Sequence, residues 1–177
     1  MIRNAIRQRL RRLMVFFGVA LAAASAAVVL TGTPAFAAYT YVGTFRISTG
    51  FNCLEVYGSQ TANGIPVILG PCDSGDNQRW AVFLVTGGNP TYYQIMAYGG
   101  AYPLNKCLDA PDSSQFVHIW GCHGGHQQRW ETYSGQIRLV SGDNRCLGVL
   151  AGQLLDAIHQ NCNSSQFPPP NWTLTPV

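Results

Sequence analysis

Polar and apolar positions alternate over short stretches along most of the chain after residue 37. Three of these stretches are Phe45-Arg46-Ile47, Tyr93-Gln94-Ile95 and Ile137-Arg138-Leu139. A period of two is typical of a strand with one buried face. Clusters of glycine, proline, serine and asparagine, which favour turns, separate the stretches. The pattern therefore predicts an all-β protein made of short strands joined by turns.

Three segments of the chain are copies of one unit. Each begins with Cys-Leu and carries an alternating stretch that ends at a second cysteine; they run from 53 to 72, from 107 to 122 and from 146 to 162. In the first two copies Gln-Arg-Trp follows, which places Trp80 and Trp130 eight positions after the second cysteine. A repeat of this kind indicates a fold built from similar units that share one core.

The third copy ends differently. Its tryptophan, Trp172, lies ten positions after Cys162, and Pro168, Pro169 and Pro170 stand where Gln-Arg-Trp is expected. Proline cannot donate a hydrogen bond to a strand ladder. We therefore expect this ending to loop out before Trp172 returns to the core.

All six cysteines lie after residue 37, and six cysteines allow 15 disulfide patterns. A unit used three times should bridge itself in the same way each time. The repeat therefore predicts the pairs Cys53–Cys72, Cys107–Cys122 and Cys146–Cys162.

The first 37 residues have the layout of an export signal. Five arginines are followed by an apolar run from Leu13 to Leu30 and by the small-residue motif Ala35-Phe36-Ala37. This order predicts a secretory signal peptide that is cleaved after Ala37, through either the general or the twin-arginine route. The run of 18 residues is also long enough for a membrane anchor, which is the alternative.

Without this segment the charge of the chain changes sign. Five of its 11 basic residues lie in the signal, and the six that remain face all eight acids, a net charge of −2. Nucleic acid is not an expected partner, because phosphate binding needs a concentrated basic surface. Residues 38–177 are expected to form a single secreted domain with repeats at about 42–85, 91–131 and 135–175, and without a membrane partner after cleavage.

Cys-Leu-Asp, an aromatic residue two positions before a second cysteine, and a Q-x-W ending resemble the ricin-B-type β-trefoil lectins. The resemblance covers about residues 42–175, because the motif elements recur in order and in phase. It implies a β-trefoil of three four-stranded units that binds carbohydrate, such as galactose- or xylose-type sugars, without catalysis or a cofactor. It also implies that Gln78, Trp80, Trp130 and Trp172 of the Q-x-W endings are structural, as expected for a large indole repeated at a strand-like position.

The second unit keeps the set of residues with which the family binds sugar. Asp109 is the carboxylate that accepts hydroxyl hydrogen bonds, and Trp120 is the plane for the C–H face of the sugar. His118 lies on the same strand face as Trp120, and Gln127 and Gln128 supply amides. Gln127 stands where the family usually has Asn. The stretch from Asp109 to Trp120 is four residues shorter than in the first unit, which puts the position of the Asp109 loop in question.

The other two units are poorer matches. The first has Glu55 for the aspartate and Gly70 for the aromatic residue, but keeps Asn77-Gln78, so its ability to bind stays open. The third has Gly148 for the carboxylate and a broken Q-x-W ending that keeps Trp172. We expect the third unit to act as scaffold.

The sequence also raises three other functions. Cys122, His123 and His126 could bind zinc, but the other units have no copy of this cluster. Hydrolysis of glycosides usually needs two carboxylates at a set separation, and no repeated or paired acidic motif is present. The main alternative is a sugar-inactive trefoil that serves as a secreted protein-binding scaffold or inhibitor.

Overall fold

The computed structural model describes residues 37–99, 102–150, 155–165 and 169–177. Within these residues the chain forms strands and three single-turn 3-10 helices, and the predicted all-β class is confirmed. The strands are β1 (Ala38–Thr49), β2 (Asn52–Val56), β3 (Ile65–Pro71), β4 (Trp80–Thr86), β5 (Tyr92–Gly99), β6 (Tyr102–Asp109), β7 (His118–Gly121), β8 (Trp130–Tyr133), β9 (Gln136–Leu139), β10 (Arg145–Leu150), β11 (Leu155–Asn161) and β12 (Thr173–Pro176). The 3-10 helices are η1 (Tyr57–Ser59), η2 (Asp76–Gln78) and η3 (His126–Gln128).

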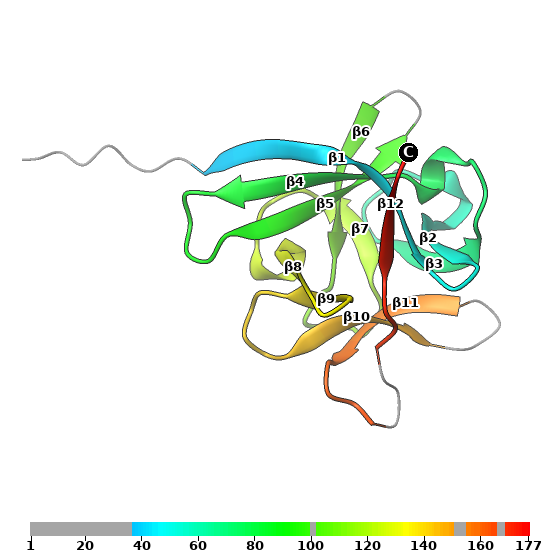
Figure 1. The fold of residues 1–177 in the computed structure, drawn as a ribbon. Helices are drawn as coiled ribbons and strands as arrows, with labels where there is room; N and C mark the ends of the chain where they lie inside the picture. Colours follow the sequence, from blue (N-terminus) through cyan, green and yellow to red (C-terminus); the bar gives the residue numbers. More distant parts are fainter. Residues whose placement is uncertain (1–36, 100–101, 151–154, 166–168) are drawn as a thin grey trace, which may run out of the picture. The chain divides into compact units, whose positions relative to one another are not determined.

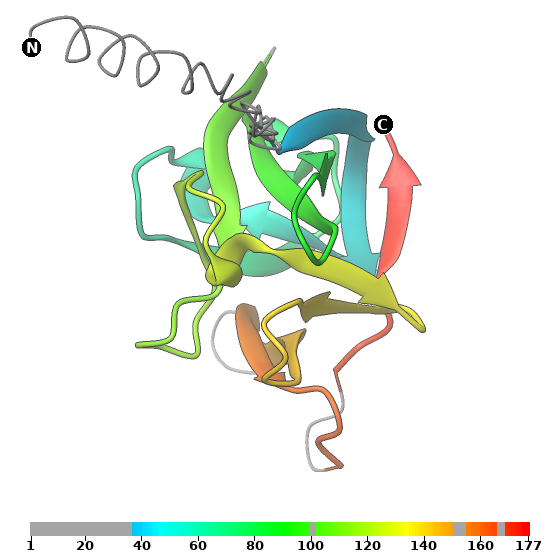
Figure 2. The same cartoon turned by 90° about the vertical axis from the view of Figure 1, so that its left-hand side faces the viewer.

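Each repeat contributes four strands, and the three repeats follow one another along the chain from blue to red (Figures 1 and 2). The first and fourth strands of the repeats pair in the order β12-β1-β4-β5-β8-β9 and form the barrel. The second and third strands form the hairpins β2–β3, β6–β7 and β10–β11. This arrangement is a β-trefoil, which confirms the fold that the resemblance to the ricin-B-type lectins implied.

The three hairpins contact one another. Strand β3 pairs with β7 through Ile65 and Ile119, and with β11 through Leu69 and Leu155. A bridge that includes Phe116 joins the second hairpin to the third. These pairings connect the three repeats and hold the hairpins in fixed positions relative to one another.

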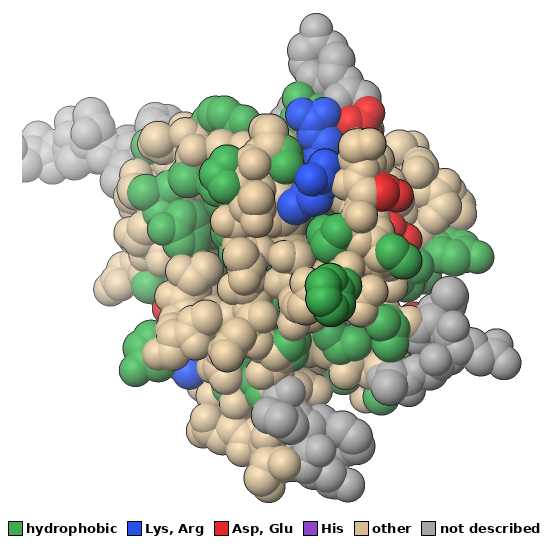
Figure 3. Space-filling view, turned by 45° about the vertical axis from the view of Figure 1, so that its right-hand side comes forward, with side chains coloured by type: hydrophobic (Ala, Val, Ile, Leu, Met, Phe, Trp, Pro, Cys, Tyr) green, Lys and Arg blue, Asp and Glu red, His purple; other side chains and the backbone are tan. Residues whose placement is uncertain are grey.

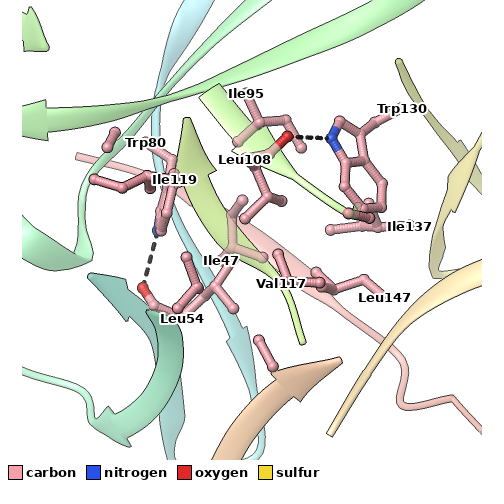
Figure 4. Packing of buried hydrophobic residues seen from close by; sticks show 14 of the residues in the cluster. Ile47, Leu54, Trp80, Ile95, Leu108, Val117, Ile119, Trp130, Ile137 and Leu147 are labelled. Carbon is pink, nitrogen blue, oxygen red and sulfur yellow. Dashed lines mark hydrogen bonds between the residues drawn. The ribbon is translucent and has the colours of Figure 1, made fainter. Parts of the chain in front are cut away.

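The core contains one tryptophan from each repeat. The indole N–H groups of Trp80 and Trp130 donate to the carbonyls of Leu54 and Leu108 at 2.9 Å, as Figure 4 shows. Trp172 is also buried and donates to the carbonyl of Leu147 at 3.1 Å. Each acceptor is the leucine of the Cys-Leu pair in the same repeat. The two ends of the repeated motif therefore bond to each other in the core, which satisfies the buried indole N–H.

The three predicted disulfides are confirmed, one within each repeat. The second and third strands of the repeats also share one register. Asp109 lies opposite His118 on the neighbouring strand, as Glu55 lies opposite Ile68 and Gly148 opposite Ile158. The shorter stretch in the second repeat therefore leaves Asp109 in register, because the missing residues come from the turn of the hairpin.

The predicted export signal lies outside the described residues, apart from Ala37. Among the described residues no helix has the length and apolar character that crossing a bilayer requires.

Candidate functional site

A shallow pocket of about 220 Å³ opens beside the turn of the second hairpin, where β6 ends and β7 begins. Four of the five predicted sugar-binding residues line it, namely Asp109, His118, Trp120 and Gln127, together with Pro111, Ser113 and His123. Asp109 ends β6, and His118 and Trp120 lie on β7. The β6–β7 pairing and the loop after Cys122 therefore bring these side chains together.

Asp109 is the floor of the pocket and is 4% exposed. Gln128 Nε2 donates to its Oδ2 at 2.8 Å. The Nε2 atom of His118 lies 3.3 Å from Oδ1, and that of His123 lies 3.4 Å from Oδ2. Nitrogen donors on both oxygens stabilise the ionised carboxylate.

The pKa of Asp109 reflects these opposing effects. Burial raises it, but hydrogen bonds from His118 and Gln128 and the charges of His118 and His123 lower it. Together the lowering effects outweigh burial, and the pKa lies below the ordinary carboxyl value. The pocket therefore offers a carboxylate and not a carboxylic acid at neutral pH.

Trp120 forms one wall and is 42% exposed, unlike the buried tryptophans of the core. Its ring lies 5.5 Å from that of His118 between centroids, tilted by 42°. The first repeat supports this wall, because Asn63 Oδ1 accepts a hydrogen bond from the Gly121 N–H at 2.9 Å. Asn63 Oδ1 also accepts from Lys106 Nζ at 2.6 Å.

His123 lines the pocket, although from the sequence it is a candidate only as a zinc ligand. Its Nδ1 accepts a hydrogen bond from the Gly125 N–H at 3.0 Å, so in the neutral ring the proton is on Nε2, toward Asp109. A sequence signal for His123 is its place directly after the second cysteine of its repeat, where the first repeat also has a polar residue. In the first repeat Asp73 also follows the second cysteine and accepts from the N–H two residues on, at Gly75.

Gln127 borders the pocket beside an exposed polar group around Asp112. Gln127 Nε2 donates to Asp112 Oδ2 at 3.2 Å, and His126 Nε2 lies 2.8 Å from the same oxygen. Arg145 of the third repeat binds Asp112 Oδ1 at 2.9 Å. The hydrogen bond from His126 is the largest influence that holds the pKa of Asp112 below its ordinary value.

Gln128, which the sequence predicts to bind sugar, does not line the pocket. It is fully buried behind Asp109, and its Oε1 accepts hydrogen bonds from the N–H groups of His123 and Gly124 at 2.9 and 3.2 Å. Its Nε2 donates to Asp109 and to the carbonyl of Gly121. The amide therefore orients Asp109 and the loop after Cys122 from within the protein.

The corresponding positions in the other repeats are filled by their own side chains. The carboxylate of Glu55 lies over Gly70, where a Cβ would come within 2.8 Å of it. Gln78 Nε2 holds Glu55 Oε2 at 2.8 Å. In the third repeat the side chain of Gln160 lies over Gly148, 2.5 Å from the place of a Cβ.

The cluster considered for zinc does not keep its three ligands, because Cys122 is bonded to Cys107. The described part of the chain holds no group of three His, Cys, Asp or Glu side chains placed to bind a metal ion.

The charges on one face of the molecule are visible in Figure 3. Most of the Lys and Arg side chains seen there gather near the top of the view, with Asp and Glu side chains beside them. Charges of both signs partly cancel where they lie together. Uncharged side chains make up most of this face.

The family profile described as the ricin-type beta-trefoil lectin domain matches residues 100–176. The resemblance derived from the repeats is therefore confirmed over the part of the chain that holds the pocket. The probable lipoprotein EnvE of Salmonella typhimurium is 49% identical over 35 residues. These residues are 20% of this chain and 20% of that protein, so the likeness spans only a fifth of the relative's length.

Solved structures share the fold. The designed three-fold symmetric protein ThreeFoil is 24% identical with a TM-score of 0.58, over 76% of this chain and 99% of that one. The C-half of the earthworm R-type lectin, solved in complex with GalNAc, is 13% identical with a TM-score of 0.55 over the same shares. A mosquitocidal holotoxin is 15% identical with a TM-score of 0.63, over 76% of this chain and 17% of that one.

Proposed function

We propose that this chain, which matches the ricin-type β-trefoil lectin domain over residues 100–176, is a secreted carbohydrate-binding protein with its sugar site in the second repeat. The observation that carries the proposal is one pocket that combines the ionised carboxylate of Asp109 with the exposed indole of Trp120. A pyranose has both matching features, hydroxyl groups at its edge and a C–H face.

Asp109 would accept a sugar hydroxyl. An ionised carboxylate has about four lone-pair positions, and the contacts from Gln128, His118 and His123 use three of them. One position is left for a hydroxyl donor. A hydrogen bond to a charged acceptor is stronger than one to a neutral acceptor.

Trp120 would provide the plane against which the sugar lies. Its indole is attached to β7, which the disulfide of the second repeat and Asn63 both hold in place. A fixed ring loses little conformational freedom on binding, so it favours a stacked ligand.

The remaining polar groups would fix the orientation of the sugar. Gln127 Nε2 is bound to Asp112, so the ligand would meet the Oε1 atom, an acceptor for a second hydroxyl. His118 and His123 present their ring edges on either side of Asp109. The set differs from that of the other two repeats, where Glu55 and Gln160 occupy the corresponding space.

We propose binding without catalysis. Among the described residues that line the pocket, Asp109 is the one carboxylate, whereas glycoside hydrolysis usually uses a pair. A single shallow pocket implies a dissociation constant near 1 mM, or about −4 kcal/mol.

Secretion is part of the proposal. Three disulfides in a chain of this size are typical of an oxidising compartment outside the cytosol. The arginine-rich and apolar segment before Ala37 has the order of an export signal.

The experiment compares sugar binding of the wild type with that of Trp120→Ala by isothermal titration calorimetry with galactose, lactose and xylose. We expect Trp120→Ala to weaken binding at least tenfold. Phe51→Ala is the matched control, because Phe51 is an aromatic residue that is 94% exposed and lies outside the pocket. Equal binding by the wild type and Trp120→Ala would exclude this site.

A second candidate is a secreted trefoil that binds a protein through its loops. Glu55 and Gln160 fill the sites of two repeats, which favours this candidate over a multivalent lectin. A wild type that binds none of a broad set of glycans would support it.

A further inference from the structure

A second hollow of about 500 Å³ lies between the first and second repeats, and it is more than twice as large as the pocket at Trp120. We call it the inter-repeat cleft and define it by Val56, Thr61, Asp76, Asn77, Tyr98 and Leu104. The first four residues belong to the first repeat, around η1 and η2. Tyr98 and Leu104 belong to β5 and β6 of the second repeat.

The cleft is not the first-repeat copy of the Trp120 pocket. The residues of the first repeat that correspond to Asp109, His118 and Trp120 are Glu55, Ile68 and Gly70, and they do not line the cleft. Asn77, the counterpart of Gln127, does line the cleft.

The walls combine an apolar floor with a polar rim. Val56 is 2% exposed and Leu104 packs against the core, so both are fixed in position. Ser59, Gln60 and Thr61 on the rim offer two hydroxyls and an amide. Apolar surface beside several neutral hydrogen-bonding groups fits a ligand with many hydroxyls and a C–H face.

Tyr98 is held in place by the first repeat. The Arg79 guanidinium lies over its ring, 4.6 Å from the centroid, and the Tyr98 N–H donates to the Arg79 carbonyl at 2.9 Å. A cation over one face of an aromatic ring fixes that ring. Tyr98 also lines the cleft, so a ligand there would meet an aromatic residue in a fixed position.

The charge in the cleft is compensated. Asp76 is the carboxylate among its lining residues, and Arg79 Nη1 binds Asp76 Oδ1 at 2.9 Å. A free cation would have to compete with this arginine, and an anion would meet the aspartate. A neutral ligand meets neither obstacle.

Asn77 is available for a ligand. Its Nδ2 makes only long contacts, 3.4 Å to the carbonyl of Val56 and 3.5 Å to Glu55 Oε2. Hydrogen bonds of this length are weak. A hydroxyl oxygen in the cleft could accept from this amide at little cost to the fold.

We propose that the inter-repeat cleft binds a neutral carbohydrate of about two sugar units, as a second site separate from the Trp120 pocket. The ligand class rests on the proposed function, whereas the position of the site rests on the cleft itself. Two weak sites on one chain would bind a polymeric glycan more tightly than either site alone.

The test is a titration of the isotope-labelled chain with lactose and, separately, with xylobiose, followed through backbone amide resonances. We expect two groups of amides to shift for at least one sugar, one around Trp120 and one around Thr61, Asn77 and Tyr98. Trp120→Ala should remove the first group and keep the second. Thr61→Arg, on an exposed loop, should weaken binding in the cleft at least tenfold and leave the first group unchanged.

The outcomes separate the two proposals. Shifts around Trp120 with none around Thr61, Asn77 and Tyr98 would overturn the cleft and leave the proposed function standing. Shifts around the cleft with none around Trp120 would support the cleft and overturn the site in the second repeat. Tyr98→Ala adds a check that removes the aromatic residue, and Thr61→Arg keeps the test decisive if Tyr98→Ala fails to fold.

Discussion

Gln128 holds Asp109 from within the protein, with a hydrogen bond of 2.8 Å between its Nε2 and Asp109 Oδ2. The first repeat contains the same relationship, because Gln78 Nε2 donates to Glu55 Oε2 at 2.8 Å. Both glutamines are fully buried. The glutamine of the Q-x-W ending thus connects the core tryptophan, two residues later, to the carboxylate of its own repeat.

Replacing Gln128 with leucine should weaken sugar binding at least tenfold and destabilise the fold by about 1–3 kcal/mol, because Asp109 and two backbone N–H groups lose their partner. Calorimetric titration and denaturant unfolding measure the two effects. Gln78→Leu is the matched control, since it removes the corresponding bonds of the first repeat, to Glu55, to the Pro71 carbonyl and from the Asp73 N–H. It should lower stability similarly and leave binding at Trp120 intact. If Gln128→Leu binds sugar like Gln78→Leu, the amide does not position Asp109 for the ligand.

The architecture could be predicted from the sequence because it depends on repeated packing. Each Cys-Leu pair and each later tryptophan bond within one repeat, as Leu108 and Trp130 do, and three copies make the pattern visible. The site was harder to predict from the sequence, because it depends on the direction in which single side chains point. Gln128 points inward and His123 points toward Asp109, and neither direction follows from spacing alone. The unchanged register of Asp109 depends on strand pairing that the loop length did not reveal.

Asp109→Asn should destabilise the chain at pH 7, and the difference from the wild type should shrink as the pH falls below about 4. The pKa of Asp109 is lower in the fold than the ordinary value. Its ionised form therefore stabilises the fold above the ordinary pKa, and this contribution is lost as the pH drops through the lowered pKa. Asparagine does not titrate and keeps none of this dependence.

Urea unfolding of both proteins between pH 7 and pH 2 measures the effect of Asp109, which should be about 1–3 kcal/mol at neutral pH. Both proteins will also lose stability from Asp112 and Asp143, whose pKa values are likewise lowered. The difference between the two proteins isolates Asp109. A difference that stays constant over this range would contradict the lowered pKa.

Asn63→Ala should weaken binding at Trp120 severalfold although Asn63 does not line the pocket. The substitution removes the acceptor for the Gly121 N–H and for Lys106 Nζ, so the end of β7 loses its support from the first repeat. Because Asn63 is exposed, the melting temperature should change little. Asn163→Ala, an exposed asparagine of the third repeat, is the control and should bind as the wild type does. Unchanged binding by Asn63→Ala would show that Trp120 is held by its own repeat alone.

The disulfides offer a separate test of which repeat binds sugar. Replacing both cysteines of a pair with alanine should cost about 3 kcal/mol, because the loops closed by Cys107–Cys122 and Cys146–Cys162 span 15 and 16 residues. The stability losses should therefore be similar, and urea unfolding measures them.

Sugar binding by the two variants should differ, because Trp120 lies opposite Cys107 and His123 follows Cys122. Under conditions where both variants are folded, loss of the second-repeat bridge should weaken sugar binding at least tenfold, and loss of the third-repeat bridge should leave it within twofold. If the two variants lost sugar affinity equally, binding would depend on the stability of the whole fold and not on the pocket at Trp120.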